Sequence, residues 1–126
     1  METYEDVKMF MEYSDQNQHG INSSQAKLYL KLVEEEFTEL TDAFAAKDLV
    51  EVADGIIDLI WVLEGLAITC NIPVQEIWDE VARSNMSKIN PKTGKTDKNE
   101  NGKVLKPATY SPPEIRKILK EHKLKV

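Results

Sequence analysis

The amino-acid sequence predicts an all-α fold, a helical bundle of four to five helices with a long basic loop before the C-terminal helix. Three observations predict it. Apolar residues recur at helical spacing, helix-capping residues precede most of the periodic segments, and the apolar run over 50–70 has the length of a helix. The 126 residues are enough for one domain, 1–126, with a core of its own.

The first two helices are predicted over 3–16 and from Ser23 or Ser24 to about residue 46. A loop over 15–24, rich in Asn, Gln and Gly, separates them, and either serine offers an N-cap for the second helix. The second helix carries one apolar face, made of Val33, Phe37, Leu40 and Phe44.

The third helix, over 50–70, is apolar nearly all round, so we expect it to be buried on several sides as the spine of the fold. Asp48 can cap it, and Cys70 closes it as a buried, inert thiol. Pro73 fits the first turn of a fourth helix that runs to about Ser87. The apolar stripe of that helix is Val74, Ile77, Trp78 and Val81, and at such spacing Trp61 and Trp78 are typical core residues.

Periodicity disappears over 88–110, a lysine-rich loop with successive turn signals and room for a short hairpin. A loop of this length is usually functional or disordered, so we look for a function for this one. The motif Ser111-Pro112-Pro113-Glu114 then predicts a capping box that opens a last helix over 111–124.

The net charge of −6 is unevenly distributed: residues 1–87 hold 5 basic against 18 acidic side chains, and residues 88–126 hold 11 against 4. The acidic part would repel a nucleic-acid polymer, whereas a small phosphorylated ligand suits both parts. No apolar run approaches the roughly 18 residues of a membrane span, and the N-terminus lacks signal-peptide features. We therefore expect a cytoplasmic protein with no membrane partner.

Two groups of carboxylates stand next to apolar helical faces. Glu36 and Glu39 lie about 60° apart on the second helix, and Asp54 and Asp58 lie about 40° apart on the third. No basic residue lies between Asp48 and Ile77 to compensate them. A divalent cation is the natural compensation, and Mg2+, with Mn2+ as a possible substitute, prefers such oxygen ligands. A glutamate run alone is as typical of a solvated face, but that does not explain two aspartates in an apolar helix.

These residues resemble a known signature. Glu35-Glu36-Phe37-Thr38-Glu39 matches E-E-x-x-E, and Glu51-Val52-Ala53-Asp54 matches E-x-x-D. Together with Asp58-Leu59-Ile60-Trp61 they resemble the all-alpha nucleoside triphosphate pyrophosphohydrolases, the superfamily of MazG, dimeric dUTPases, dCTP pyrophosphatase and phosphoribosyl-ATP pyrophosphohydrolase. The similarity covers roughly residues 25–90. It implies an enzyme in which Mg2+ binds a triphosphate, and water releases pyrophosphate and leaves a monophosphate.

The resemblance also implies roles for the acids. Glu36, Glu39 and Asp58 would be the principal metal ligands, Asp54 a further ligand, and Glu35 a ligand or the base that orients water. One departure is that the position three residues before Asp58 is Gly55, so that either Glu51 or Asp54 partners Asp58.

The segment from Arg83 to Lys88 and the motifs around Gly102-Lys103 and Lys106 to Pro112 resemble MazG-like proteins related to phosphoribosyl-ATP pyrophosphohydrolase. The resemblance favours Lys88 as a phosphate contact beside Asn85, although both residues are also common at helix C-termini. Lys95, Lys103 and Lys106 are candidates for closing over the triphosphate, with a solvated loop as the equal alternative, and Tyr110 is a further substrate-binding candidate. The family resemblance also implies a homodimer or a dimer of dimers with substrate bound between protomers.

Three functions follow as alternatives. The first is hydrolysis of a (deoxy)nucleoside triphosphate, with house-cleaning of dUTP or a non-canonical nucleotide as the hypothesis for its role. The second is hydrolysis of phosphoribosyl-ATP. The third is a helical nucleotide- or partner-binding protein without turnover, which would be expected to have lost some of the acids.

Overall fold

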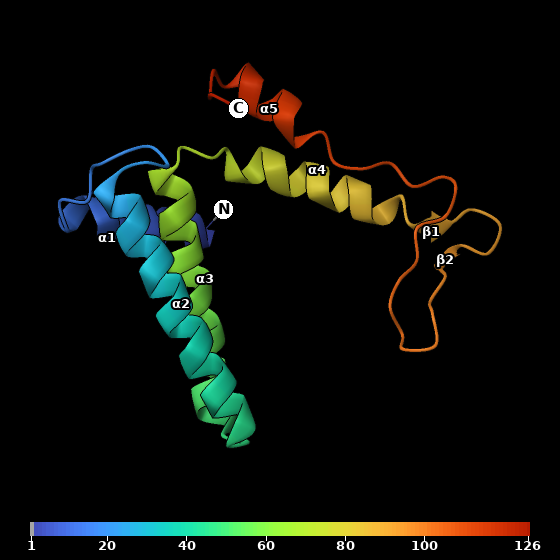
Figure 1. Cartoon of the computed structure of the whole chain (residues 1–126), viewed down its shortest axis with the longest axis horizontal. Coiled ribbons are helices and arrows are strands. Elements are labelled where there is room, and N and C mark those ends of the chain that lie inside the picture. The colour runs from blue at the N-terminus through green and yellow to red at the C-terminus, as the bar shows by residue number, and fades with distance from the viewer. Residues whose placement is uncertain (1) are drawn as a thin grey trace. The chain divides into compact units, whose positions relative to one another are not determined.

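The computed structural model describes residues 2–126, and this part of the chain forms five helices and one two-stranded hairpin (Figure 1). The all-α prediction is confirmed. Contacts divide the chain into two compact units, Met1–Ile72 (unit 1) and Pro73–Val126 (unit 2), and each is described by itself. The helices are α1 (Glu2–Tyr13), α2 (Ser24–Ala45), α3 (Leu49–Thr69), α4 (Val74–Met86) and α5 (Ile115–Glu121), and the strands are β1 (Ile89–Asn90) and β2 (Lys95–Thr96).

Unit 1 is a long hairpin of α2 and α3, which lie side by side, with α1 packed at one end (Figure 1). Both predicted N-caps are present: the Ser23 side chain accepts a hydrogen bond from the Ala26 N–H, and Asp48 accepts one from the Glu51 N–H. Each cap satisfies an amide that has no partner within its helix. These caps fix where the two helices that carry the acids begin.

The core of unit 1 lies where α1 meets the hairpin, around the buried side chains of Val7, Met11, Tyr29 and Val62. The Tyr29 ring lies directly over Gly65, and its hydroxyl donates a hydrogen bond to Gln16. The buried Gln25 amide donates to the Thr69 hydroxyl, which itself donates to the Gly65 carbonyl. A satisfied polar pair and a glycine therefore anchor α2 to α3 at this end.

The remainder of the hairpin is less covered than the sequence predicts. Phe37 and Phe44 are 55% and 62% exposed, so the predicted apolar face of α2 is only partly a core face. The expectation that α3 is buried on several sides is wrong for the chain alone, since Val50 and Ile57 are 76% and 60% exposed. The reason is geometric, because α2 covers one face of α3 and α1 reaches only one end (Figure 1).

Unit 2 joins α5 to α4 through a charged cluster. Arg83 donates two hydrogen bonds to Glu80, at 2.7 and 2.9 Å, and one to the Pro112 carbonyl at 3.0 Å. Glu80 also accepts the Glu114 backbone N–H at 2.6 Å, and the His122 ring lies 2.8 Å from Glu76. Trp78, expected in the core, is instead 61% exposed on α4.

The predicted capping box at Ser111 is wrong. α5 begins at Ile115, its N-cap residue is Glu114, and no side chain caps it. Ser111 instead pairs with Ser87 at the end of α4: its backbone N–H donates to the Ser87 hydroxyl, which also contacts the Ser111 carbonyl. The Glu114 N–H that a cap would satisfy is taken by Glu80 on α4.

The basic loop contains the predicted short hairpin. β1 and β2 pair antiparallel with Ile89 opposite Thr96, and an isolated bridge joins Lys98 to Val104. Gly102, at φ 81°, supplies the left-handed turn between the bridged residues. Within residues 2–126 no single helix is long and apolar enough to cross a membrane, and only α3 and α4 together, with a break between them, reach that length and hydropathy.

Candidate functional site

The acids of α2 lie along one edge of the helix, toward and beside α3. Glu36 is half-buried, and Glu35 and Glu39 are exposed. Glu36 and Leu40, one turn apart, are the half-buried positions of this segment, so Glu36 takes a place that an apolar residue would normally occupy. A carboxylate at such a position is costly unless a cation accompanies it.

The acids of α3 meet those of α2 across the hairpin. Asp58 is half-buried, and Asp54, one turn earlier, is exposed. The charges that act most on Asp58 are those of Asp54 and Glu39. Glu51 lies in the first turn of α3 with an exposed side chain, above the Asp48 cap. The structure therefore pairs Asp54 with Asp58, which the sequence left open.

Burial and mutual repulsion act on this carboxylate group (Glu36, Glu39, Asp54 and Asp58) together. Burial raises the pKa of Glu36 above its ordinary value, and the negative charges of Glu39, Asp58 and Asp54 raise it further. Burial also raises the pKa of Asp58, with further contributions from Asp54 and Glu39. Among the described residues, no neighbouring positive charge contributes to either pKa shift.

The donor set fits a hard divalent cation. One carboxylate oxygen of Glu36, Oε2, is buried without a hydrogen-bond partner, as expected of an oxygen that serves an ion. All four side chains offer oxygen, which is what Mg2+ prefers. In the part of the chain that the structure describes, no three His, Cys, Asp or Glu side chains close around one point as they stand. The acids are thus grouped, and an ion would require their side chains to rotate toward it.

A shallow hollow of about 410 Å³ adjoins the carboxylate group on α2. Glu39 belongs to both, and the other lining residues are Lys31, Glu34, Glu35 and Thr38. Glu35 therefore faces open solvent beside the group, where a water molecule can reach it. Lys31 is the one basic residue in this lining, and sequence reasoning missed it because nothing in the pattern distinguishes it from any other exposed lysine on a helix.

The predicted substrate-binding residues all lie in unit 2, whereas all the acids lie in unit 1. The Lys88 ammonium donates to the Asn85 side-chain oxygen at 3.1 Å. It also lies 5.9 Å from the centre of the Tyr110 ring, and Lys106 lies 5.0 Å from the same centre. The structure therefore brings Asn85, Lys88, Lys106 and Tyr110 together, with two ammonium groups near one aromatic ring.

Lys95 and Lys103 lie elsewhere in the basic loop. Lys95 is in β2, and Lys103 follows the Gly102 turn, where its backbone pairs with Asn99. Both side chains are exposed. Their proposed closure over substrate stays a prediction.

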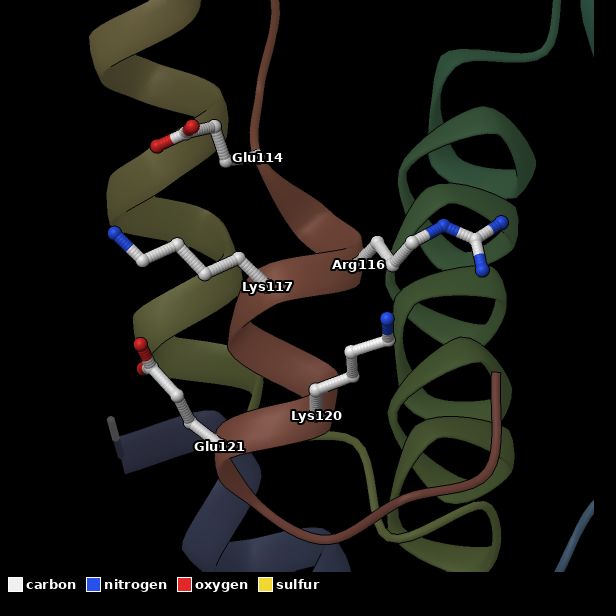
Figure 2. Close-up of a pocket in the computed structure, with 5 residues that line it drawn as sticks. All are labelled: Glu114, Arg116, Lys117, Lys120 and Glu121. Carbon is white, nitrogen blue, oxygen red and sulfur yellow. The ribbon is translucent and has the colours of Figure 1, made fainter.

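Figure 2 shows a second hollow, on α5, with Glu114, Lys117 and Glu121 on one side of the helix and Arg116 and Lys120 on the other. Its volume is about 610 Å³ and its lining is mixed in charge. No residue predicted for the site lies in this lining, so it is not part of the candidate site.

Comparison with known proteins gives one finding. The sequence model of a family described as phosphoribosyl-ATP pyrophosphohydrolase matches residues 5–85. That range covers the carboxylate group and nearly all of α4, and it ends before the basic loop. No curated protein matches the chain.

Proposed function

Because the chain belongs to the phosphoribosyl-ATP pyrophosphohydrolase family, a member of the all-alpha MazG-like superfamily, we propose that it is a Mg2+-dependent nucleotide pyrophosphohydrolase. The family acts on phosphoric anhydrides. The observation that carries the proposal is the carboxylate group itself: four acids from two facing helices, two of them with pKa values raised by burial. Within residues 2–126 none of the four forms a salt bridge.

Glu36, Glu39, Asp54 and Asp58 would hold the ion. Bound there, Mg2+ supplies neutralisation of the charge on the phosphate oxygens, which is most of what phosphoryl transfer asks of a catalyst. The chain's own contribution is to carry the four carboxylates on two stiff helices, so that binding the ion requires rotation of side chains and no rearrangement of the backbone. Mn2+, with similar ligand preferences, is the expected substitute.

Glu35 is proposed to orient the attacking water. The oxygen of that water forms a new bond to phosphorus, the anhydride bond breaks, and pyrophosphate leaves with the bonding electron pair. The proton of the water passes to the Glu35 carboxylate, which is exposed beside the carboxylate group. No side chain forms a covalent bond in this scheme.

Asn85, Lys88, Lys106 and Tyr110 are proposed to contact the substrate, with Lys103 as a further phosphate contact. Two ammonium groups near one ring make a concentrated positive site that suits a phosphate group. The hydrogen bond from Lys88 holds the Asn85 amide in a fixed orientation, with its NH2 group left free to donate.

We also propose a homodimer or a dimer of dimers. Phe44, Leu49, Val50 and Ile57 are each more than half exposed at the uncovered end of unit 1. Monomeric proteins rarely expose so many large apolar side chains together. A second copy of the same hairpin would cover them. The cytoplasm is the compartment we propose.

Two substrates are candidates, a (deoxy)nucleoside triphosphate such as dUTP or a non-canonical nucleotide, and phosphoribosyl-ATP. Both contain the anhydride that the scheme requires, and the family description favours the second. The experiment is a pyrophosphate-release assay with Mg2+ on phosphoribosyl-ATP and on a panel of canonical and modified triphosphates. Turnover of triphosphates would support house-cleaning, and turnover of phosphoribosyl-ATP alone would select the second candidate. Absence of release from every substrate would contradict the proposal.

A further inference from the structure

A glycine lies between the two aspartates of α3 at the point where α3 passes close to α2. Gly55 is buried and directly follows Asp54. A Cβ atom added to it would lie 3.3 Å from both Cα and Cβ of Leu40 and 3.4 Å from its Cδ1. Ordinary carbon contacts are about 3.5–4.0 Å, so any side chain here must push the two helices apart by a few tenths of an ångström.

This close approach lies beside the carboxylate group on both helices. Leu40 directly follows Glu39 and is one turn beyond Glu36, while Gly55 directly follows Asp54 and is three residues before Asp58. The separation of the backbones at Leu40 and Gly55 therefore sets how far the acids of α2 stand from those of α3. A glycine in mid-helix costs about 1 kcal/mol relative to alanine, so its presence here needs a reason.

We propose that Gly55 is a positioning residue that fixes the α2–α3 spacing for Mg2+ and thereby selects Mg2+ over larger cations. The inference rests on the proposed function of the carboxylate group. Mg2+ demands near-ideal octahedral geometry at about 2.0–2.1 Å, whereas Ca2+ accepts flexible geometry at about 2.3–2.6 Å. A small outward shift of one helix therefore removes Mg2+ binding first. Gly55 touches neither the ion nor the substrate.

The test is ion binding to the full chain, measured by calorimetric titration with Mg2+ alone and with Ca2+ alone for the wild type, Gly55→Ala and Gly55→Val. We expect Mg2+ affinity to fall roughly tenfold or more in Gly55→Ala, as for other residues that orient metal ligands, and further in Gly55→Val. Ca2+ affinity should change by less than threefold, so the preference between the ions shifts. The helical circular dichroism of Gly55→Ala without metal should match the wild type.

Two further variants separate spacing from loss of packing. Leu40→Ala keeps Gly55 and serves as the matched control: it removes side-chain atoms without adding any atom between the two helices, so its Mg2+ affinity should stay within about threefold of the wild type, below the loss of roughly tenfold or more expected for a ligand-orienting residue. The double variant Leu40→Gly/Gly55→Ala removes the contacts with Leu40 Cβ and Cδ1 but keeps the 3.3 Å contact with the Cα atom, so it should recover part of the Mg2+ binding that Gly55→Ala lost. Should Gly55→Ala fail to fold, the double variant must restore the fold and bind Mg2+ more weakly than the wild type while keeping its Ca2+ affinity.

The outcomes are distinct. A folded Gly55→Ala that keeps wild-type Mg2+ affinity, or in which the affinities for Mg2+ and Ca2+ fall by the same factor, overturns the role of Gly55 and leaves the proposed function intact. A wild type that binds neither ion contradicts the proposed metal site itself. A double variant that folds and binds Mg2+ no better than Gly55→Ala also overturns the spacing argument.

Discussion

Gly65→Ala should destabilise unit 1 far more than the same substitution at Gly55. A Cβ atom at Gly65 would lie 2.2 Å from Tyr29 Cε1 and 2.7 Å from two more ring atoms, against 3.3 Å for the nearest contact at Gly55. Ordinary contact is about 3.5–4.0 Å, so the ring or the helix must move by more than about 1 Å. The Tyr29 ring has little free space, since it is only 2% exposed and its hydroxyl is bonded to Gln16.

The magnitude follows from three contributions. Overpacking a core costs about 1–3 kcal/mol. Loss of the Tyr29 hydrogen bond costs about 0.5–1.5 kcal/mol. Replacing a helical glycine with alanine returns about 1 kcal/mol. The net expectation is a loss of about 2 kcal/mol in the free energy of unfolding for Gly65→Ala, within the range of typical core substitutions.

The assay is urea unfolding followed by helical circular dichroism, with Gly55→Ala as the matched control because it changes the same atom on the same helix. Gly55→Ala should stay within about 1 kcal/mol of the wild type, since the gain in helix propensity offsets its milder contact. Tyr29→Phe in the Gly65→Ala background should add little, because the hydrogen bond is already lost. Equal stability of the two alanine variants would refute the reasoning from close approach.

Four other outcomes follow, three from the candidate site and one from the α4–α5 contact. Asp58→Asn should lower the rate of pyrophosphate release by about a hundredfold or more and abolish the rise in melting temperature that we expect Mg2+ to give the wild type; wild-type rates would rule out a role for this acid. Glu35→Gln should lower kcat more than KM, because the group acts on water and does not bind substrate; a change in KM alone would contradict this. Lys88→Ala and Lys106→Ala should each raise KM for the substrate, with Lys92→Ala as an exposed control in the same loop that leaves KM unchanged. The pKa of the Glu80 carboxyl is lowered from an ordinary 4.5 to about 2, mainly by its hydrogen bonds to Arg83 and to the Glu114 N–H, so this group should titrate near pH 2 in carbon-detected NMR. Because the folded pKa is depressed, the contribution of Glu80 to the α4–α5 contact is present above pH 4.5 and is lost as pH falls toward 2. Arg83→Ala should return the pKa of Glu80 toward 4.5.

The helices and two of their caps could be predicted from sequence because the relevant physics is local. Ser23 and Asp48 bond amides three residues away, and hydrophobic spacing reports a helix whatever packs against it. The capping box at Ser111 failed for the opposite reason. The Glu114 amide bonds to Glu80, 34 residues earlier in the chain, which no local pattern reveals.

Burial was predicted less well, because sequence periodicity identifies an apolar face and does not say what covers it. Phe44 and Ile57 follow helical spacing and are nevertheless exposed in the single chain. Trp78 was expected in the core on the same grounds and is exposed on α4. Each position depends on which neighbouring helix, if any, reaches it.

The acids of the candidate site could be found from sequence, since carboxylates in an apolar run without a basic neighbour contradict ordinary helical patterning. Their pairing was left with two candidates, because Asp54 and Glu51 lie one and two turns before Asp58 on the same helix. The side-chain positions in the structure make Asp54 the neighbour that acts on Asp58. The close approach of α2 to α3 at Gly55 could not be predicted either, because a glycine in a helical pattern does not indicate how near the neighbouring helix lies.

The most direct test of the metal site is a crystal structure of the full chain grown with Mn2+, whose anomalous scattering locates the ion. An anomalous peak between α2 and α3, with oxygens of Glu36, Glu39 and Asp58 at about 2.0–2.2 Å, is the predicted result, by analogy with the distances of Mg2+. A map without such a peak, in which these side chains point apart into solvent or meet lysine or arginine, would contradict the proposal that this hairpin holds a catalytic ion.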